Sequence, residues 1–484
     1  MIVHFLILSL LSGSASAMEK HGGKVLEPRT VFVQLFEWPW KDIARECEEY
    51  LGPNGFAAVQ VSPPQEHLVL PDAPWWTRYQ PISYRLDSRS GSEREFRDMV
   101  ARCKHAGVDI YVDAVINHMS AMPEGVGSAG SRFKKYEYDG LYSYSDFHHC
   151  GRNGNDRIVD YRDRYELQNC ELLGLSDLNT ASPSVQNRIA GYLNKLLEFG
   201  VAGFRLDAVK HIASSDIRGI LQRVRGDPYI LQEIIPGEGQ PTYSEYLDIG
   251  DVNVFEYAFG VSRAARDEWL GEFLGSFSQF PNSDSAVVFV ENHDLQRLNR
   301  EQYRLLSYRD DPELYFLAEA FMLTWPYGYP QLFSGYDFSS YDQGPPTTQD
   351  KSRVRTVLNY AGQCTSGWTC EHRAPGIAEL VKFRNATDQQ FTATNVAHNG
   401  RSQIVFGRGN LGFVAINFSD FPLIGSYATD LPPGQYCNIL ESRYRSRLDY
   451  RRCSNPYNVT KDRQITLNVP PRTAVVLQRA IAEP

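Results

Sequence analysis

The chain has 484 residues, of which 42% are hydrophobic, and a formal net charge of -9 at pH 7. A chain of this length exceeds what one domain usually holds, so we expect one large domain and one or two smaller units. The acidic balance and the lack of Lys/Arg runs argue against a nucleic-acid-binding protein. No apolar segment after the N-terminus reaches about 18 residues, which argues against an integral membrane protein.

The N-terminal residues have the pattern of a secretion signal. An apolar stretch at residues 5–11 is followed by the small residues Ala15, Ser16 and Ala17, which are typical of a signal peptide and its cleavage site. A buried or membrane helix is the less favoured alternative, because the stretch is too short to span a bilayer. We therefore expect residues 1–17 to be a signal peptide and the mature protein to be secreted.

Apolar runs typical of buried strands then alternate with amphipathic segments typical of helices. The eight candidate strands are residues 31–38, 56–63, 109–118, 201–211, 229–235, 254–259, 286–294 and 329–338. The clearest candidate helices are residues 93–106, 184–199, 216–224 and 314–324. Eight such units predict an α/β fold with a closed (β/α)8 TIM barrel, formed by residues 18–118 and 184–390.

Two smaller domains are expected beside the barrel. The polar stretch between the third strand and its helix is far longer than an ordinary βα loop, so residues 119–183 should form an inserted domain over the barrel mouth. After about residue 390 the pattern changes to short alternating runs separated by Gly, Pro and Asn, which is typical of an antiparallel β-sandwich. We expect residues 391–484 to form this C-terminal domain, with strands at 403–408, 412–418, 435–440, 464–469 and 473–478.

Eight cysteines in a secreted chain indicate disulfides. Pairing sequence neighbours gives Cys47 with Cys103, Cys150 with Cys170, Cys364 with Cys370, and Cys437 with Cys453. The alternative is that several of them are free, buried thiols. The chain has no Cys-x-x-Cys motif that would indicate zinc binding or a redox site.

Three carboxylates each end a short apolar run in a separate segment. They are Asp207, Glu233 and Asp294. Because the carboxyl ends of parallel strands meet at one rim of a barrel, we expect the three acids to lie together there. Their charges repel one another, so such a cluster indicates an active site.

Four segments around these acids resemble, in order, the four signature regions of the α-amylase family. The segments are residues 113–118, residues 203–211, Glu233 and residues 289–294. The resemblance is strongest to the animal-type, chloride-binding α-amylases and their bacterial relatives. It extends from about residue 31 into the C-terminal domain and includes the cysteine positions, except that one inserted-domain disulfide of vertebrate members has no cysteines here.

The chemistry of the three acids follows from what bond cleavage needs. Cleaving a glycosidic bond with retention requires a nucleophilic carboxylate and a second carboxylic acid about 5 to 5.5 Å away. Asp207 is the natural nucleophile, because Arg205 shares its strand face and favours the ionised form. Glu233 is then the acid/base, since apolar neighbours and nearby acids favour its protonated form. The resemblance assigns Asp294 to binding substrate hydroxyls and stabilising the transition state.

Aromatic side chains supply part of the predicted substrate site. Trp75, Trp76 and Tyr79 fall in a loop after the second strand, where flat rings can stack on glucose while Gln80 bonds hydroxyls. The alternative is that these rings close a core.

Basic side chains complete the predicted substrate site. The resemblance makes His118 and His293 hydrogen-bond donors to the sugar, and it adds Lys210 and His211 to the binding set. Histidine is more often a structural residue. Here the histidines lie beside acids at or just beyond strand ends, which favours a functional interpretation.

The resemblance also implies a bound Ca2+. The matching ligands are the side chains of Asn117 and Asp177 and the backbone carbonyls of Gln168 and His211. All four supply oxygen atoms, which Ca2+ prefers. They would join the inserted domain to the barrel.

The chloride site of the family is incomplete in this sequence. Arg205 and Asn292 match two of its ligands, but the third, basic position is Gln331. A neutral amide supplies no full charge to hold an anion, so we expect weak or absent chloride dependence. The Gly-rich loop that follows the third acid in many relatives is also missing, because residues 295–300 contain no glycine.

The sequence thus predicts a secreted, endo-acting α-amylase that hydrolyses internal α-1,4 bonds of starch, glycogen and malto-oligosaccharides. We expect it to be a monomer. One alternative is a sister enzyme that uses the same acids for transglycosylation or for short oligosaccharides. Another is a non-catalytic relative that binds sugar or a protein partner. The three intact acids argue against the non-catalytic alternative.

Overall fold

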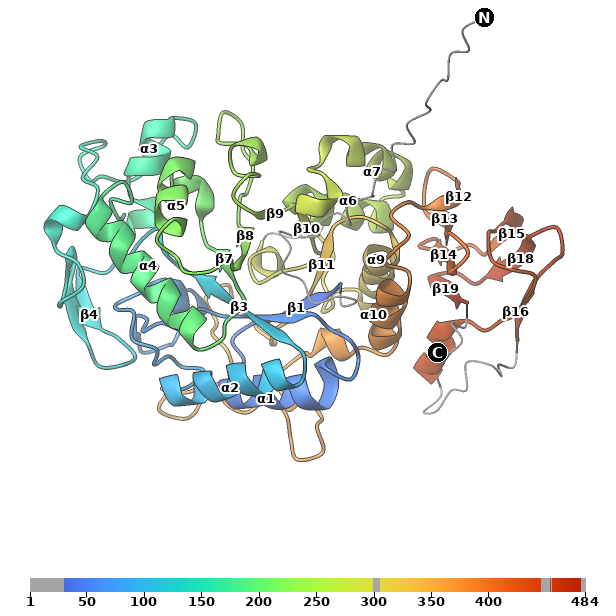
Figure 1. Ribbon diagram of the computed structural model, residues 1–484, viewed down its shortest axis with the longest axis horizontal. Helices are drawn as coiled ribbons and strands as arrows, with labels where there is room; N and C mark the ends of the chain where they lie inside the picture. Colours follow the sequence, from blue (N-terminus) through green and yellow to red (C-terminus); the bar gives the residue numbers. More distant parts are fainter. Residues whose placement is uncertain (1–29, 299–304, 445–452, 454, 480–484) are drawn as a thin grey trace, which may run out of the picture.

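Eight parallel strands form a closed barrel in the computed structural model of the chain, which describes residues 30–298, 305–444, 453 and 455–479 (Figure 1). They are β1 (Phe32–Leu35), β2 (Ala58–Val61), β3 (Asp109–Ala114), β7 (Gly203–Leu206), β8 (Tyr229–Gln232), β9 (Asp251–Asn253), β10 (Ala286–Val288) and β11 (Tyr329–Ser334). Each strand pairs with its neighbours in chain order, and β1 closes the ring by pairing with β11. The predicted (β/α)8 barrel is confirmed.

Aromatic side chains fill the barrel toward the end where the strands begin. The ring centroids of Phe32 and Tyr329, and those of Tyr111 and Tyr229, lie 4.7 Å apart, and all four residues are buried. Gly203 is required beside them, because a Cβ there would lie 2.6 Å from the Tyr229 carbonyl oxygen. This end of the barrel is therefore a packed core, and the opposite rim has room for a ligand.

Helices cover the outside of the barrel. They are α1 (Trp40–Glu46), α2 (Glu93–His105), α4 (Pro183–Glu198), α5 (Ser214–Leu221), α6 (Phe255–Arg266), α7 (Leu270–Ser276), α9 (Pro312–Thr324) and α10 (Ile377–Ala386). Helix α2 begins at a capping box in which the Ser92 and Glu95 side chains satisfy each other's backbone N–H groups. Helix α9 contacts the C-terminal strands β14 and β19 as well as α10, which explains why it is apolar on nearly all sides.

The prediction for the sixth barrel strand was wrong. Residues 254–259 were predicted to be that strand, but Phe255 begins helix α6 and the strand is β9, a few residues earlier. Two of the three β9 residues, Asp251 and Asn253, are polar but buried, and Asp251 Oδ2 accepts a hydrogen bond of 2.9 Å from the Tyr229 hydroxyl. A buried strand of polar residues lacks the apolar signal on which sequence-based prediction depends.

The long insertion after β3 forms a separate layer at one end of the barrel (Figure 1). It contains β4 (Glu124–Val126), β5 (Arg132–Lys134), β6 (Glu137–Tyr138), α3 (Arg164–Asn169) and short 3-10 turns that include η5 (Leu172–Gly174). The buried Glu66, which follows β2, holds this layer to the barrel. Its Oε1 accepts hydrogen bonds of 2.9 Å from the backbone N–H groups of Ala129 and Ser131.

Two antiparallel sheets form the C-terminal part, as predicted. One sheet has the order β12 (Thr394–His398), β13 (Gln403–Arg408), β14 (Gly412–Asn417), β19 (Thr473–Gln478), and the other has the order β15 (Leu423–Ala428), β18 (Gln464–Val469), β17 (Tyr457–Val459), β16 (Gly434–Tyr436). Their facing side chains, such as Phe413, Ile465 and Val475, form a core separate from that of the barrel.

One C-terminal strand is shorter than predicted. Residues 435–440 were predicted as a strand, but β16 ends at Tyr436 and Ile439 begins the 3-10 helix η12 (Ile439–Tyr444). The reason is Asn438, whose Oδ1 accepts hydrogen bonds from the backbone N–H groups of Leu440 at 3.1 Å and Val476 at 2.9 Å. A side chain that bonds nearby backbone in this way favours a turn over an extended strand.

The disulfide pairing is as predicted. The structure joins Cys47 to Cys103, Cys150 to Cys170, Cys364 to Cys370, and Cys437 to Cys453. The proposed signal segment, residues 1–17, lies outside the described residues. Within the described part of the chain, no helix has the length and apolar character needed to cross a membrane.

Candidate active site

The three predicted acids meet at the carboxyl rim of the barrel, where they line one cavity of about 550 Å³. Asp207 follows β7 directly, Glu233 follows β8 directly, and Asp294 lies in the loop after β10. All three side chains are reached from the same cavity, although each residue as a whole is mostly buried. Sequence segments far apart in the chain therefore contribute to a single site.

A single guanidinium binds three carboxylates at this site. Arg205 Nη1 lies 2.6 Å from Asp113 Oδ1 and 2.7 Å from Asp207 Oδ1, and Nη2 lies 2.5 Å from Glu233 Oε1. Arg205 is only 3% exposed, so these contacts are made in a medium of low polarity. Because adjacent nitrogens of one planar group hold Asp207 and Glu233, the two carboxylates lie side by side.

The backbone after β7 also fixes Glu233. The Ala208 N–H donates a hydrogen bond of 2.9 Å to Glu233 Oε2, and Ala208 has a positive φ of 52°. A left-handed alanine is strained, and such strain is typical of functional sites. Here it turns the chain immediately after Asp207 and aims a backbone donor at the neighbouring acid.

Three of the aspartates at this site have raised pKa values, and burial is the main cause. Burial raises the pKa of Asp207 well above its ordinary value, and Arg205 opposes this shift while Glu233 and Asp113 add to it. Burial likewise raises the pKa of Asp294, and it raises that of Asp113 to about 6. Arg205 thus acts on Asp207 in the expected direction, but burial outweighs it. Asp113, Asp207 and Asp294 therefore retain protons at a higher pH than isolated carboxyl groups would.

Two aromatic rings hold the His293 side chain. Its ring stacks against Phe36 at 4.9 Å and against Tyr79 at 5.1 Å between centroids. Its Nε2 lies 3.5 Å from Asp294 Oδ2, and its Nδ1 contacts Gln34 Nε2 at 3.1 Å. Burial, together with the charges of Arg205 and Arg297, lowers the pKa of His293 well below its usual value, so the ring is neutral at ordinary pH.

His118 also lines the cavity, but it is engaged with the protein. Its Nε2 lies 2.9 Å from the Tyr79 carbonyl oxygen, and its Nδ1 lies 3.3 Å from Asn117 Nδ2. Burial lowers the pKa of His118 to about 4. Donation from Nε2 to the carbonyl ties the end of β3 to the aromatic turn after β2.

The aromatic residues of that turn, η3 (Trp75–Tyr79), differ in exposure. Trp75 is 6% exposed and donates its indole N–H to the Tyr341 carbonyl at 2.9 Å, while Tyr79 donates its hydroxyl to Asp113 Oδ2 at 2.8 Å. Trp76 is less buried and donates its indole N–H to Asp342 Oδ1 at 2.8 Å. All three rings line the cavity, so the alternative that they only close a core does not hold.

The other predicted contacts divide between the cavity wall and its support. Gln80 lines the cavity, and its Oε1 accepts hydrogen bonds from the Ser120 hydroxyl at 2.8 Å and the Ala121 N–H at 3.1 Å. Lys210 and His211, in η6 (Val209–His211), are not among the residues that line this cavity. Lys210 Nζ instead donates to the Ile235 carbonyl at 3.0 Å, which supports the segment that follows Glu233.

Sequence reasoning missed the apolar part of the cavity wall. The additional lining residues are Ala121, Leu172, Leu173, Leu175, Ala208, Ile235 and Tyr341. Leu173 is 76% exposed. A run of leucines in an otherwise polar insertion is the sequence signal that indicates this apolar wall. Tyr341 lies in an irregular loop after β11, and the sequence gives no sign that this loop folds back over η3.

The four predicted calcium ligands lie where the inserted layer meets the barrel. Asn117 Nδ2 is 3.2 Å from Asp177 Oδ1, and the His211 ring bonds the Leu167 carbonyl beside Gln168 at 3.0 Å. Asp177 is 2% exposed. One buried carboxylate, one amide and two carbonyl oxygens fit a hard cation such as Ca2+. Among the described residues no cluster of three or more His, Cys, Asp or Glu could hold a metal, so such a site would depend on amide and carbonyl oxygens.

The residues of the predicted chloride site are engaged with protein groups. Asn292 Oδ1 accepts hydrogen bonds from the N–H groups of Asp294 at 3.1 Å and Leu295 at 2.8 Å, which fixes the turn that carries the third acid. Gln331 Nε2 donates to Gln34 Oε1 at 3.3 Å, and its Oε1 accepts from Asn253 Nδ2 at 3.4 Å. Weak or absent chloride dependence remains a prediction.

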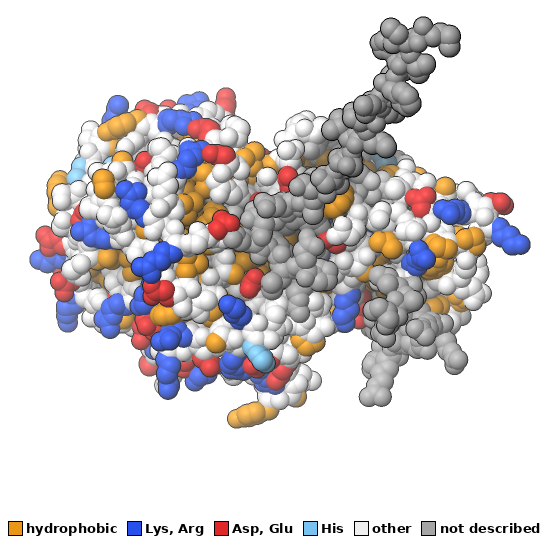
Figure 2. Space-filling view, viewed as in Figure 1, with side chains coloured by type: hydrophobic (Ala, Val, Ile, Leu, Met, Phe, Trp, Pro, Cys, Tyr) orange, Lys and Arg blue, Asp and Glu red, His pale blue; other side chains and the backbone are white. Residues whose placement is uncertain are grey.

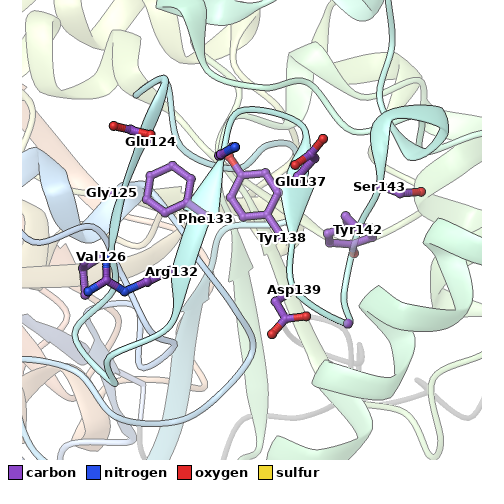
Figure 3. Close-up of a pocket in the computed structure, with 12 residues that line it drawn as sticks. Glu124, Gly125, Val126, Arg132, Phe133, Glu137, Tyr138, Asp139, Tyr142 and Ser143 are labelled. Atoms are coloured by element: carbon purple, nitrogen blue, oxygen red, sulfur yellow. The ribbon is translucent and has the colours of Figure 1, made fainter.

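A second hollow, of about 570 Å³, lies over the small sheet β4–β6 of the insertion (Figure 3). The stacked rings of Phe133 and Tyr138, 5.3 Å apart, form its floor, but they are only 4% and 1% exposed. None of the predicted site residues lines it. On the molecular face that carries α4 and α5, acidic and basic side chains are interspersed (Figure 2).

Known proteins match this chain along most of its length. The family models described as alpha amylase, catalytic domain, and alpha amylase, C-terminal all-beta domain, match residues 50–247 and 394–480. An alpha-amylase of Thermomonospora curvata is 43% identical over 465 residues, which are 93% of this chain and 73% of that one. An alpha-amylase of Pecten maximus is 41% identical over 445 residues, 86% of each chain.

Solved structures give the same relationship. The crystal structure of alpha-amylase I from Eisenia fetida has a TM-score of 0.86 and 34% identity, and the match covers 94% of this chain and 98% of that one. A variant of that enzyme, solved as a complex with maltohexaose, matches equally well. With its barrel, its C-terminal sheets and its cluster of acids, the chain belongs to the α-amylase family of glycoside hydrolases.

Proposed function

We propose that this protein is a secreted, endo-acting α-amylase, working as a monomer, that hydrolyses internal α-1,4 bonds of starch and glycogen with retention of configuration. The observation that carries the proposal is the pair of carboxylates, Asp207 and Glu233, held by one guanidinium at the wall of the cavity. Four disulfides are typical of extracellular proteins, which supports secretion.

In the first step, Glu233 donates a proton to the glycosidic oxygen while Asp207 attacks the anomeric carbon. The bond to the leaving sugar breaks, and a covalent glycosyl ester forms on Asp207. In the second step, Glu233 takes a proton from water, and the resulting nucleophile displaces Asp207 from the anomeric carbon. Two displacements at one carbon restore the starting configuration.

Asp294 and His293 are proposed to bind hydroxyls of the sugar at the cleavage point. Both line the cavity beside Glu233, and Asp294 is hydrogen-bonded with Glu233 as well as exposed to the charges of Arg205 and Arg297. Donors and acceptors held rigidly in a low-polarity site stabilise developing charge more effectively than water does. Trp76, with its indole N–H tied to Asp342, is placed to stack on a neighbouring glucose unit.

The Ca2+ ion is proposed to bind Asn117, Gln168, Asp177 and His211. When bound, the cation would supply positive charge that neutralises the buried Asp177 carboxylate. Asn117 follows β3, His211 follows β7, and the other two ligands belong to the insertion. These residues therefore hold the insertion, which carries the leucines of the cavity wall, against the barrel.

Incubation with soluble starch tests this function. We expect the wild type to release reducing ends rapidly, with a fall in iodine staining that precedes the accumulation of small sugars, as endo-cleavage requires. Larger or cyclic products without a rise in reducing ends would indicate transglycosylation instead. An unchanged count of reducing ends would contradict the proposal.

A further inference from the structure

A row of buried amide side chains crosses the barrel and ends at His293. Asn253 on β9 donates to Gln331 on β11 at 3.4 Å, Gln331 donates to Gln34 on β1 at 3.3 Å, and Gln34 donates to His293 Nδ1 at 3.1 Å. All four residues are buried, and none is more than 5% exposed. Water cannot readily replace these hydrogen bonds, so each amide depends on its neighbours.

The direction of donation is the same along the whole row. Each amide offers its NH2 group to the next residue and accepts on its carbonyl oxygen from the previous one. Reversing Gln34 alone would place its NH2 group against the NH2 group of Gln331. A reversed Gln34 therefore requires a reversed Gln331, which in turn would face the NH2 group of Asn253.

A neutral imidazole has one N–H group and one acceptor nitrogen. The hydrogen bond made by one ring nitrogen therefore decides which of the two nitrogens carries the proton. Because Gln34 donates to Nδ1, Nδ1 is the acceptor and the proton of His293 resides on Nε2. The stacked rings of Phe36 and Tyr79 hold the imidazole plane. The Nε2–H group therefore points to Asp294 Oδ2, 3.5 Å away at the cavity wall.

We propose that Gln34, oriented by Gln331, is a positioning residue that keeps His293 in the tautomer with its proton on Nε2. This role rests on the proposed function, in which His293 donates a hydrogen bond to the sugar. With the proton on Nδ1, the Nε2 lone pair would face both the Asp294 carboxylate and the sugar hydroxyls. The donor would be lost where the transition state needs it.

Two substitutions separate this role from simple packing. Gln34→Met keeps the size of the side chain but removes the donor to His293. Gln331→Met leaves Gln34 in place but removes the group that orients it. Gln60→Met is the matched control, because Gln60 is the register partner of Gln34 on β2, is 2% exposed, and has an Oε1 without a hydrogen-bond partner.

Long-range 1H–15N correlation spectra of histidine-labelled protein report the tautomer directly, with the His293 signals assigned from a His293→Gln variant. We expect the Nε2–H pattern in the wild type and in Gln60→Met. In Gln34→Met the pattern should change to a mixture of tautomers, and kcat on starch should fall about 10- to 100-fold, the range known for the hydrogen-bond partners that orient metal-ligating histidines. For Gln331→Met, both the share of the second tautomer and the loss of kcat should lie between those of the wild type and Gln34→Met.

Retention of the pure Nε2–H pattern in both Gln34→Met and Gln331→Met would overturn the proposal, as would kcat values equal to that of Gln60→Met. If Gln34→Met does not fold, the tautomer pattern and kcat of Gln331→Met test the proposal in its place. The spectra do not depend on activity. A wild type that shows the Nε2–H pattern but releases no reducing ends from starch would contradict the proposed function while leaving the tautomer assignment intact.

Discussion

Two buried clusters of charged side chains in this molecule look alike in composition but differ in consequence. In the active-site cluster, Arg205 contacts Asp113, Asp207 and Glu233 at the wall of a cavity. In the sealed cluster, Glu46 on α1 contacts His372 Nε2 at 2.8 Å and Arg373 Nε at 2.6 Å. The first cluster has more acids than bases, and the second has more bases than acids.

The pKa values show what this difference does. Burial raises the pKa of Asp207 far above its usual value despite Arg205. Burial also acts to raise the pKa of Glu46, but the hydrogen bonds and charges of His372 and Arg373 outweigh it, so that the pKa of Glu46 is lowered. An acid matched by bases stays ionised and holds elements together, whereas buried acids that outnumber their bases share protons among themselves.

The sealed cluster even includes a Ser–His–Glu series, because the Ser334 hydroxyl lies 2.6 Å from His372 Nδ1. In a hydrolase such a series indicates a nucleophile and its base. Ser334, His372 and Glu46 are all at most 1% exposed, so a substrate cannot reach the hydroxyl. Access to a cavity, and not the residue types, separates a catalytic cluster from a structural one.

The largest effect is expected at Asp207. Asp207→Asn removes the nucleophile but keeps the shape of the side chain, so kcat on soluble starch should fall on the order of 10⁴-fold. The measurement is the rate of release of reducing ends by purified, folded protein. Activity within tenfold of the wild type would contradict the assignment of Asp207.

The matching substitution in the sealed cluster should affect stability and not catalysis. Glu46→Gln leaves His372 and Arg373 without their buried partner, so the free energy of unfolding should fall by about 3 to 5 kcal/mol. Denaturant titration measures this, and kcat of the remaining folded protein should stay within about twofold. Glu49→Gln, which breaks an exposed pair with Arg45, is the control and should cost less than about 1 kcal/mol. A loss of kcat as large as that of Asp207→Asn would show that the two clusters do not differ as described.

Glu319 on α9 is a third case, an acid sealed in the core next to Tyr315 and a second acid, Glu371. Burial raises the pKa of Glu319 to about 8. A raised pKa in the folded state stabilises the protein fully only below the unfolded pKa, near 4.3, and this contribution is lost as pH rises through 8. Between these pH values the free energy of unfolding of the wild type should fall by a few kcal/mol. That of Glu319→Gln should not show this fall, because the amide does not titrate.

Melting temperatures from pH 4.5 to pH 8.5 test this difference. Glu313→Gln, on an exposed position of the same helix, is the control and should follow the wild type. Parallel curves for the wild type and Glu319→Gln would mean that Glu319 is not protonated in the folded state.

The smallest expected effect concerns the inserted layer that borders the cavity. Added Ca2+ should raise the melting temperature of chelator-treated protein by several degrees, because a ligand that binds only the folded state stabilises it. Asp177→Asn should remove most of this rise, whereas Asp160→Asn, at an exposed acid of the same layer, should not. An equal rise in all three proteins would contradict the proposed calcium ligands.

The barrel and the place of its three acids could be predicted from the sequence, because an apolar run that ends in an acid is easily recognised as a buried strand followed by a site residue. The positions of Asp207, Glu233 and Asp294 at one rim follow from the rule that parallel strands share their carboxyl ends. The β9 strand could not be predicted, because its polar residues are satisfied only by contacts with other strands, such as that between Asp251 and Tyr229.

Long-range contacts explain the other differences as well. Nothing in the local sequence indicates that Tyr341 folds over Trp75, that Arg205 binds three acids at once, or that Gln331 and Gln34 are joined. The sealed position of Ser334 and His372 is also a property of the packed fold. Sequence patterns show which side chains could act in catalysis, and the packed fold determines which of them line a cavity that a substrate can enter.

The most direct test of the central claim is to trap the reaction on the enzyme with a fluorinated maltosyl fluoride, and to identify the modified residue by peptide mass spectrometry. A retaining mechanism with Asp207 as nucleophile predicts one glycosyl adduct, on Asp207, and α-configured first products by NMR. An adduct on Glu233 or Asp294, or β-configured products without any adduct, would contradict it.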